Sequence, residues 1–147
     1  MILNQQRRVR VRPAVLNEFL ARVRSTVGVS DQSVSICLVT DAAMSRMNKR
    51  YRGKRGPTDV LSFPANGRVA SARKSAPPRP FFLGDIAISP ETARRNARRF
   101  GRTLDDELRI LILHGILHLL GYDHEADHGE MEQIEIRLRR ELKVAGA

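Results

Sequence analysis

The stretch His114-Gly115-Ile116-Leu117-His118-Leu119-Leu120-Gly121-Tyr122-Asp123-His124 contains three of the four histidines in the 147-residue chain. On a helix, a spacing of four residues places His114 and His118 on one face, about one turn apart. Gly121 can take the left-handed conformation that ends a helix, so the chain can turn back there. His124 follows this turn, and the stretch therefore predicts a cluster of three imidazoles.

Three neutral imidazoles form a ligand set for a divalent transition metal, most often zinc. Three protein ligands leave a fourth tetrahedral position open, as in catalytic zinc sites, whereas structural sites usually close with four ligands, mostly cysteine. The chain has a single cysteine, Cys37, in an apolar run typical of a core strand. We predict one catalytic Zn²⁺ per chain on His114, His118 and His124. Histidines that fill the core or cap the helix are the alternative.

A similar histidine spacing occurs in the metalloprotease pattern H-E-x-x-H-x-x-G-x-x-H, in which the glutamate is the general base. Here Gly115 occupies that position, which argues against ordinary zinc peptide hydrolysis. Either the zinc-bound hydroxide serves as its own base, or another carboxylate, Asp59 or Asp85, helps; residues of this kind are more often turn or cap residues. His128 as a fourth ligand would close the site, so we do not include it.

The net charge of +10 is distributed unevenly along the chain. Residues 1–102 carry 21 Lys and Arg against 6 Asp and Glu, a balance of +15, while residues 103–147 carry 5 against 10, a balance of −5. Clustered arginine and lysine favour nucleic acid as the partner, because phosphates release counterions when such side chains bind. An anionic membrane fits less well, since no basic amphipathic helix with large aromatic residues is evident. Solvated surface charge is the remaining alternative.

Targeting signals are not evident in this sequence. Residues 1–12 have no apolar signal-peptide core, and the longest apolar stretch, residues 110–120, is too short to span a bilayer. A single cysteine fits a reducing compartment. These features predict a cytoplasmic protein.

Local signals predict one domain over residues 1–147, built from short strands and about five helices. Pro13, Thr40, Ser89-Pro90 and Thr103 are expected to begin helices, and the helix after Thr103 is apolar almost all round, which places it in the core. Strands are expected at 7–12, 33–39, 58–64 and 81–89, the last with a bend or bulge at Gly84, and helices at 14–27, 42–51, 90–100, after Thr103, and at 127–144. Residues 66–80, with three prolines and four basic residues, predict a flexible basic loop.

Three separated motifs carry a resemblance to a known family. They are Asn48-x-x-Tyr51-Arg52-Gly53-Lys54 with Thr58-Asp59-Val60-Leu61-Ser62-Phe63-Pro64, then Leu83-Gly84-Asp85-Ile86, and finally the histidine stretch. Through these motifs most of the chain resembles the YbeY family of bacterial endoribonucleases, also called rRNA maturation factors. The segment 66–80 departs from the family pattern and looks like a lineage-specific insertion.

The resemblance implies a zinc-dependent, single-strand-specific endoribonuclease acting in 16S rRNA 3′-end maturation and ribosome quality control. It implies zinc on His114, His118 and His124, and catalytic roles for Arg52 and His114. It also implies an α+β fold, with a four-stranded mixed sheet, about five surrounding helices and the zinc-binding helix in the core. The expected partners are single-stranded RNA, 16S rRNA and the ribosome, with no membrane and no DNA. A zinc-dependent protease-like hydrolase and a non-catalytic RNA-binding ribosome assembly factor remain the alternatives.

Overall fold

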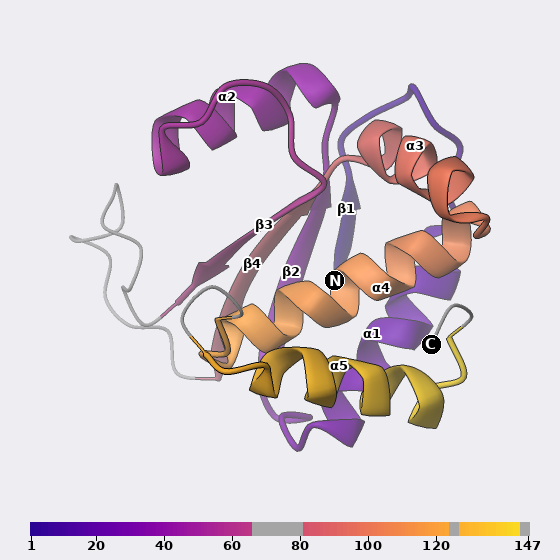
Figure 1. Ribbon diagram of the computed structural model, residues 1–147, viewed down its shortest axis with the longest axis vertical. Helices are drawn as coiled ribbons and strands as arrows, with labels where there is room; N and C mark the ends of the chain where they lie inside the picture. Colours follow the sequence, from indigo (N-terminus) through magenta and orange to yellow (C-terminus); the bar gives the residue numbers. More distant parts are fainter. Residues whose placement is uncertain (66–80, 124–126, 145–147) are drawn as a thin grey trace.

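The computed structural model describes residues 1–65, 81–123 and 127–144, and its strands form a single mixed sheet (Figure 1). The sheet order is β1-β2-β4-β3, with β1, β2 and β4 parallel and β3 antiparallel to β4. The strands are β1 (Ile2–Asn4), β2 (Ser33–Leu38), β3 (Val60–Pro64) and β4 (Phe82–Ile88). The helices of the described residues are α1 (Pro13–Thr26), α2 (Asp41–Arg52), α3 (Pro90–Phe100), α4 (Leu104–Leu119) and α5 (Glu130–Glu141). The predicted α+β fold is confirmed.

Side-chain caps fix the beginnings of three helices, at the residues that the sequence indicated. The hydroxyl of Thr40 accepts a hydrogen bond from the backbone N–H of Ala43 at 3.2 Å, and that of Thr103 accepts from Asp106 at 3.1 Å. Ser89 caps α3 in the same way, directly before a proline at the first helical position. Each cap satisfies a backbone donor that has no partner inside its helix, which is why these helices begin where they do.

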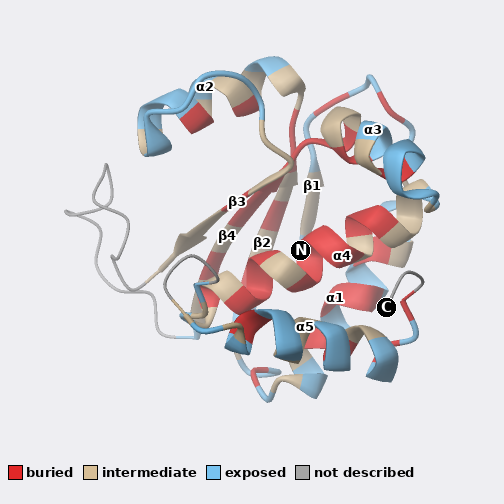
Figure 2. Ribbon diagram, in the orientation of Figure 1, coloured by how far each residue is buried: buried red, intermediate tan, exposed pale blue. Residues whose placement is uncertain are grey.

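Helix α4 is the central element of the core. It contacts the strands β3 and β4 on one side, and the helices α1, α3 and α5 on its other sides. Its apolar side chains are buried nearly all round, including Leu108, Ile112 and Ile116, each with no exposed surface (Figure 2). The prediction that the histidine-bearing helix lies in the core is therefore confirmed, and the burial of its neighbours holds both histidines in fixed positions.

The opposite face of the sheet carries a smaller apolar cluster. Val39, Met44, Leu61 and Ala87 form this cluster, with Phe63 packed against it. Met44 comes from α2, so this helix covers part of the face that α4 does not cover. The C-terminal end of α2 is thereby held beside strand β3.

Strand β3 is the outer strand of the sheet within the described residues. The carbonyl of Asp59 accepts a hydrogen bond from the N–H of Ser89, and the N–H of Ala65 donates to the carbonyl of Leu83. The backbone groups of the odd-numbered residues in and beside β3 therefore point towards β4. The backbone groups of Val60, Ser62 and Pro64 consequently point to the outer edge. Pro64 ends the strand and has no N–H to offer.

Gly84 lies at an irregularity in strand β4, as predicted. Ser33 pairs with Phe82 while Val34 pairs with Gly84, so one extra residue of β4 bulges between them. A Cβ at Gly84 would lie 2.6 Å from the carbonyl oxygen of Phe63 and 2.7 Å from Leu119, because β3 and α4 both approach closely there. Only glycine fits between them.

The expected strand at 7–12 is wrong. The edge strand on this side is β1 (Ile2–Asn4), and residues 7–12 form no strand. The amide of Gln6 donates to the carbonyl of Val9 and accepts from its N–H, both at 2.9 Å, while the Val9 side chain is buried. The Gln6 side chain thus replaces the ladder bonds that a strand would have given Val9. Helix α5 is also shorter than the expected range 127–144.

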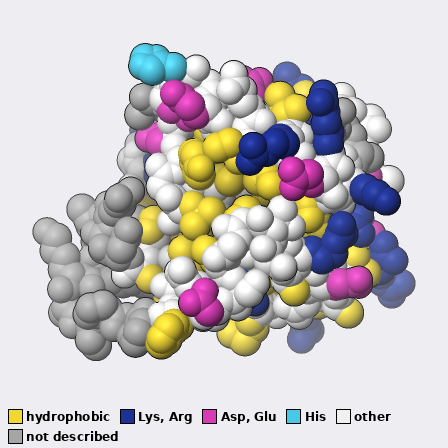
Figure 3. Space-filling model, turned by 90° about the horizontal axis from the view of Figure 1, so that it is seen from below, with side chains coloured by type: hydrophobic (Ala, Val, Ile, Leu, Met, Phe, Trp, Pro, Cys, Tyr) yellow, Lys and Arg dark blue, Asp and Glu magenta, His cyan; other side chains and the backbone are white. Residues whose placement is uncertain are grey.

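The predicted basic loop at 66–80 lies outside the described residues. No helix in the described part of the chain is long and apolar enough to cross a membrane. On the face drawn in Figure 3, the basic side chains of the described residues gather towards one edge, while the acidic ones are scattered.

Candidate functional site

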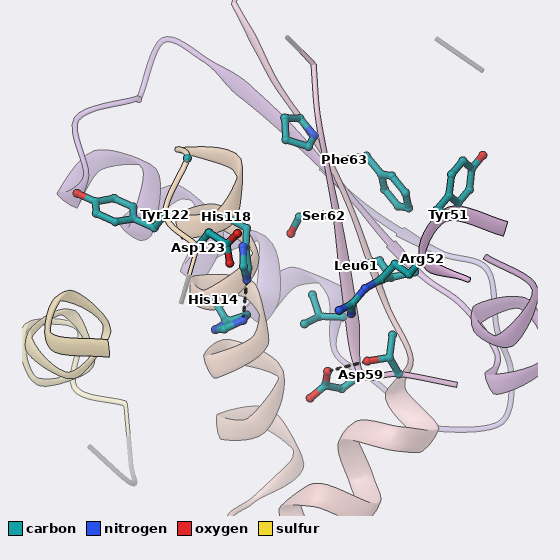
Figure 4. Close-up of a pocket in the computed structure, with 14 residues that line it drawn as sticks. Tyr51, Arg52, Asp59, Leu61, Ser62, Phe63, His114, His118, Tyr122 and Asp123 are labelled. Carbon is teal, nitrogen blue, oxygen red and sulfur yellow. Dashed lines mark hydrogen bonds between the residues drawn. The ribbon is translucent and has the colours of Figure 1, made fainter. Parts of the chain in front are cut away.

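A cleft of about 650 Å³ opens between the end of α2, the outer strand β3 and the last turns of α4 (Figure 4). Its walls combine basic, imidazole, carboxylate and aromatic side chains. The lining residues are Tyr51, Arg52, Thr58, Asp59, Val60, Leu61, Ser62, Phe63, Pro64, His114, His118, Gly121, Tyr122 and Asp123. The first and third motifs of the sequence, which end at Pro64 and begin at His114, therefore meet in one site.

His114 and His118 lie one turn apart on α4, and their side chains converge on one point. The two Nε2 atoms are 3.0 Å apart and share a hydrogen bond, and both rings are partly exposed to the cleft (Figure 4). Two imidazole nitrogens bound to the same tetrahedral zinc, each at about 2.0–2.1 Å, would lie about 3.3 Å from each other. The observed spacing therefore fits two ligands of a single ion.

Glu135 of α5 faces His114 from the side opposite to the cleft. Its Oε1 lies 3.5 Å from Nδ1 of His114 and accepts a hydrogen bond from Arg139 at 3.2 Å. Burial raises the pKa of the Glu135 carboxyl, but hydrogen bonding to His114 and attraction to His114 and Arg139 outweigh this and lower it. A carboxylate at Nδ1 keeps the proton on that nitrogen and leaves the Nε2 lone pair for a metal.

The end of α4 has the turn that the sequence predicted. The N–H of Gly121 donates to the carbonyl of His118, and that of Tyr122 donates to Leu117, a pattern of a helix closed by a left-handed glycine. Gly121 has φ of 100°. The chain therefore reverses directly after His118, which brings Tyr122 and Asp123 to the cleft.

The third predicted ligand, His124, lies outside the described residues. Among the residues that the structure describes, no group of three His, Cys, Asp or Glu side chains converges on a metal position. His128 is exposed at the start of the last helix, where its backbone N–H donates to Glu130 at 2.6 Å. The pair His114 and His118 is thus the described portion of the predicted ligand set.

Arg52 is the last residue of α2 and lies on the wall of the cleft across from the histidines. The helix ends directly after it, because Gly53 takes the left-handed conformation with φ of 65°. Figure 4 shows the guanidinium of Arg52 directed past Leu61 into the cleft. A planar guanidinium in this position can bind two phosphate oxygens.

The two carboxylates considered from the sequence lie in different places. Asp59 lines the cleft, and its Oδ2 accepts from the amide of Asn96 on α3 at 3.2 Å. Asp85 pairs with Phe63 across β4 and β3, on the face of the sheet opposite to Ile86 and α4. The geometry therefore favours Asp59 over Asp85 for chemistry at the histidines.

Sequence reasoning did not identify two features of this site. Glu135 has no local signal, because its role depends on the packing of α5 against α4. Tyr51 and Phe63 form an edge-to-face pair with ring centroids 5.1 Å apart, and both line the cleft. Both stand in the first motif of the sequence, but their pairing requires knowing that α2 packs beside β3.

Comparison with known proteins agrees with this description. The model of the family Endoribonuclease YbeY matches residues 2–143. A protein named Endoribonuclease YbeY from Koribacter versatilis is 42% identical over 146 residues, which cover 98% of this chain and 86% of that protein. Its namesake from Aquifex aeolicus is 37% identical over 132 residues, covering 90% and 82%. The solution structure of TM1509 from Thermotoga maritima aligns with a TM-score of 0.61 at 29% identity, covering 97% of this chain and 89% of that one.

Fold, cleft and relatives together place this chain in the nuclease class of hydrolases. The family model matches nearly the whole chain, so the match identifies a single family. The chain belongs to the Endoribonuclease YbeY family.

Proposed function

We propose that this chain is a zinc-dependent, single-strand-specific endoribonuclease that acts in 16S rRNA 3′-end maturation and ribosome quality control in the cytoplasm. The observation that supports the proposal best is the 3.0 Å separation of the His114 and His118 Nε2 atoms in the cleft that Arg52 also lines. His124, which follows the turn at Gly121, is proposed as the third ligand. When bound, zinc supplies a Lewis acid and activates water for phosphodiester chemistry.

We assign the other roles in the reaction to Arg52, Glu135 and Asp59. Arg52 binds the phosphate oxygens on the wall opposite the histidines, which aligns the scissile bond with the metal position. Glu135 fixes the ring of His114 and its tautomer through Nδ1. We assign proton transfer to the carboxylate of Asp59, whose Oδ2 accepts from Asn96 and whose Oδ1 accepts from the hydroxyl of Thr58 at 3.5 Å.

The glycine at position 115 favours RNA over peptide as the substrate. A peptidase needs a carboxylic acid there to protonate a departing amine, which is a poor leaving group. A ribose oxygen leaves more readily, and a cation stabilises it. The surplus of positive charge in residues 1–102 attracts phosphates and has no comparable use for a general peptide substrate.

One preparation, incubated with RNA and with casein, tests the proposal. We expect cleavage of single-stranded RNA that a chelator abolishes, weaker cleavage of duplex RNA and no cleavage of casein. Zinc-dependent proteolysis would favour the protease-like hydrolase instead. His114→Ala is the matched control: RNA cleavage that persists in this variant would come from a contaminating nuclease, and the assembly-factor alternative would then replace the proposal.

A further inference from the structure

The aromatic pair Tyr51 and Phe63 forms part of the cleft wall beside Arg52. The ring centroids are 5.1 Å apart with an interplanar angle of 70°, and both residues are partly exposed. Tyr51 comes from the last turn of α2 and Phe63 from the outer strand β3. Phe63 packs against the small apolar cluster on one side, so its ring is held in place while part of it faces the cleft.

The other aromatic residues of the chain have different surroundings. There are five phenylalanines and two tyrosines in all. Phe19 is fully buried, Phe82 is partly buried in β4, and Phe81 and Phe100 are exposed, and none of these four residues lines the cleft. Tyr122 packs against the main core, and Figure 4 shows its ring directed away from the histidines. Tyr51 and Phe63 are therefore the two aromatic residues that line the cleft as a contacting pair.

A cation contacts this pair, and a second basic residue follows it in the chain. The guanidinium carbon of Arg50 lies 5.4 Å from the centroid of the Tyr51 ring, and Arg52 follows in the chain. Proteins that bind single-stranded nucleic acid combine aromatic rings, on which bases stack, with basic side chains that follow the backbone. An edge-to-face contact covers a face of only one of the two rings, whereas a stacked pair would cover one face of each ring.

We propose that Tyr51 and Phe63 form a stacking platform for one nucleobase of single-stranded RNA, next to the phosphate bound by Arg52. This inference rests on the proposed function and specifies which residues read the single-stranded state. Bases of a duplex are stacked inside the helix and present no face to such a platform, whereas an unpaired base can rotate out onto it. Tyr51 and Phe63 are thus specificity-determining residues for the strand state of the substrate.

The chain contains no tryptophan, so a single substitution introduces a unique fluorescent probe. Phe63→Trp places the probe in the platform, and Phe100→Trp places it on an exposed position outside the cleft. With a 2′-O-methylated oligonucleotide, we expect single strands to quench the fluorescence of Phe63→Trp and the matching duplex to leave it unchanged. Arg99 and Arg102 lie beside the Phe100 ring, so Phe100→Trp reports nonspecific contact and should respond equally to single strand and duplex. Equal quenching in both variants, or none in Phe63→Trp, would overturn the proposal.

Affinity gives a second readout that does not depend on cleavage. Phe63→Leu keeps an apolar side chain of similar size but removes the π-face, and Phe63→Tyr restores it. Stacking of one base on an aromatic ring changes affinity by a factor of about 5 to 150, so Phe63→Leu should weaken binding about five-fold or more. An abasic nucleotide at the contacted position should abolish the difference between wild type and Phe63→Leu.

The two readouts separate this inference from the proposed function. Wild-type protein that binds no zinc and cleaves no RNA would refute the proposed function, whatever the fluorescence shows. Wild-type protein that cleaves RNA, with unchanged affinity and an unchanged melting temperature in Phe63→Leu, would refute the stacking platform alone. A parallel Tyr51→Leu variant extends the test to the second ring.

Discussion

Gly115 of α4 rests directly on Ile86 of β4: a Cβ at position 115 would lie 2.9 Å from Cδ1 and 3.0 Å from Cγ2 of Ile86. The missing side chain allows the helix to approach the sheet closely at this point. The hydroxyl of Ser62 donates to the carbonyl of Gly115 at 3.1 Å, which ties strand β3 to the same turn of α4. The glycine that separates this sequence from the protease pattern is therefore also a packing requirement.

Gly115→Glu, which restores the glutamate of the protease pattern, should destabilise the fold by about 3 kcal/mol or more. Overpacking alone costs about 1–3 kcal/mol, and the carboxylate would be forced against an apolar surface. Chemical denaturation measures the loss. Ile86→Ala creates space at the contact, so the double variant should lose less than the sum of the two single variants. Strict additivity would show that the contact does not limit the residue at position 115.

Zinc content should depend on three histidines and not on the fourth. His114→Ala, His118→Ala and His124→Ala each remove a proposed ligand, so each should bind less than one zinc per chain. His128→Ala is the control and should keep the metal, because His128 is exposed at the start of the last helix. Elemental analysis after dialysis measures occupancy. Full occupancy in all three ligand variants would refute the assignment.

Glu135→Gln should weaken zinc binding by about 10- to 100-fold without removing any ligand. The amide keeps the shape of the carboxylate but loses the charge that faces Nδ1 of His114. Partners of this kind contribute about that factor to metal affinity. Competition with a zinc-binding dye gives the dissociation constant. Glu132→Gln, an exposed change on the same helix, is the control, and equal constants for the two variants would assign Glu135 a purely structural role.

Arg52→Glu should reduce RNA binding and cleavage while leaving the melting temperature nearly unchanged. Arg52 is exposed at the end of α2, where single charge contacts contribute little to stability. Arg46→Glu changes the net charge by the same amount on an exposed position of the same helix that does not line the cleft. Comparable losses of RNA affinity in both variants would mean that overall charge, rather than a specific phosphate contact, explains the effect.

The carboxylate of Asp41 should stabilise the fold, and this stabilisation should be lost in acid. Burial raises the pKa of its carboxyl, but hydrogen bonds from Ser89 at 2.5 Å, from Thr92 at 2.7 Å and from Arg95 at 2.8 Å outweigh this and lower it below 3.8. Because the pKa is lower in the folded state, the stabilisation is present above pH 3.8 and is lost as the pH falls through the lowered pKa.

The matched variant Asp41→Asn isolates this contribution. It should lower the free energy of unfolding by about 1 kcal/mol at neutral pH, because charge-assisted hydrogen bonds of Asp41 join the beginnings of α2 and α3. The difference from wild type should shrink below pH 3.8. Denaturation curves between neutral pH and about pH 3 measure it. A difference that stays constant over this range would show that the charge of Asp41 does not matter.

Features encoded by neighbouring residues could be predicted from the sequence. Thr40, Ser89 and Thr103 cap helices through bonds to residues three positions later, and Gly121 closes α4 through bonds to the preceding turn. The same locality brings His114 and His118 together. Each of these contacts lies within one helical turn, so the pattern of residues is sufficient to identify it.

Features that depend on packing between distant segments could not be predicted in this way. Glu135 meets His114 only because α5 packs on α4, and Tyr51 meets Phe63 only because α2 lies beside β3. The alternation of valines and arginines in residues 7–12 suggested a strand, but the Gln6 side chain satisfies the backbone of Val9 instead. Here a tertiary contact overrides a local preference.

The outer strand β3 has a further consequence for the behaviour of the protein in concentrated solution. Within the described residues no strand pairs with the outer edge of β3, where Val60 and Ser62 direct their backbone groups. Such an edge is a template for strand addition from another molecule, and residues of this strand also line the cleft. Pro64 withdraws one donor from this edge, and the strand is only five residues long. Short length and a terminal proline thus let the protein keep an exposed strand beside the candidate site while limiting edge-to-edge self-association.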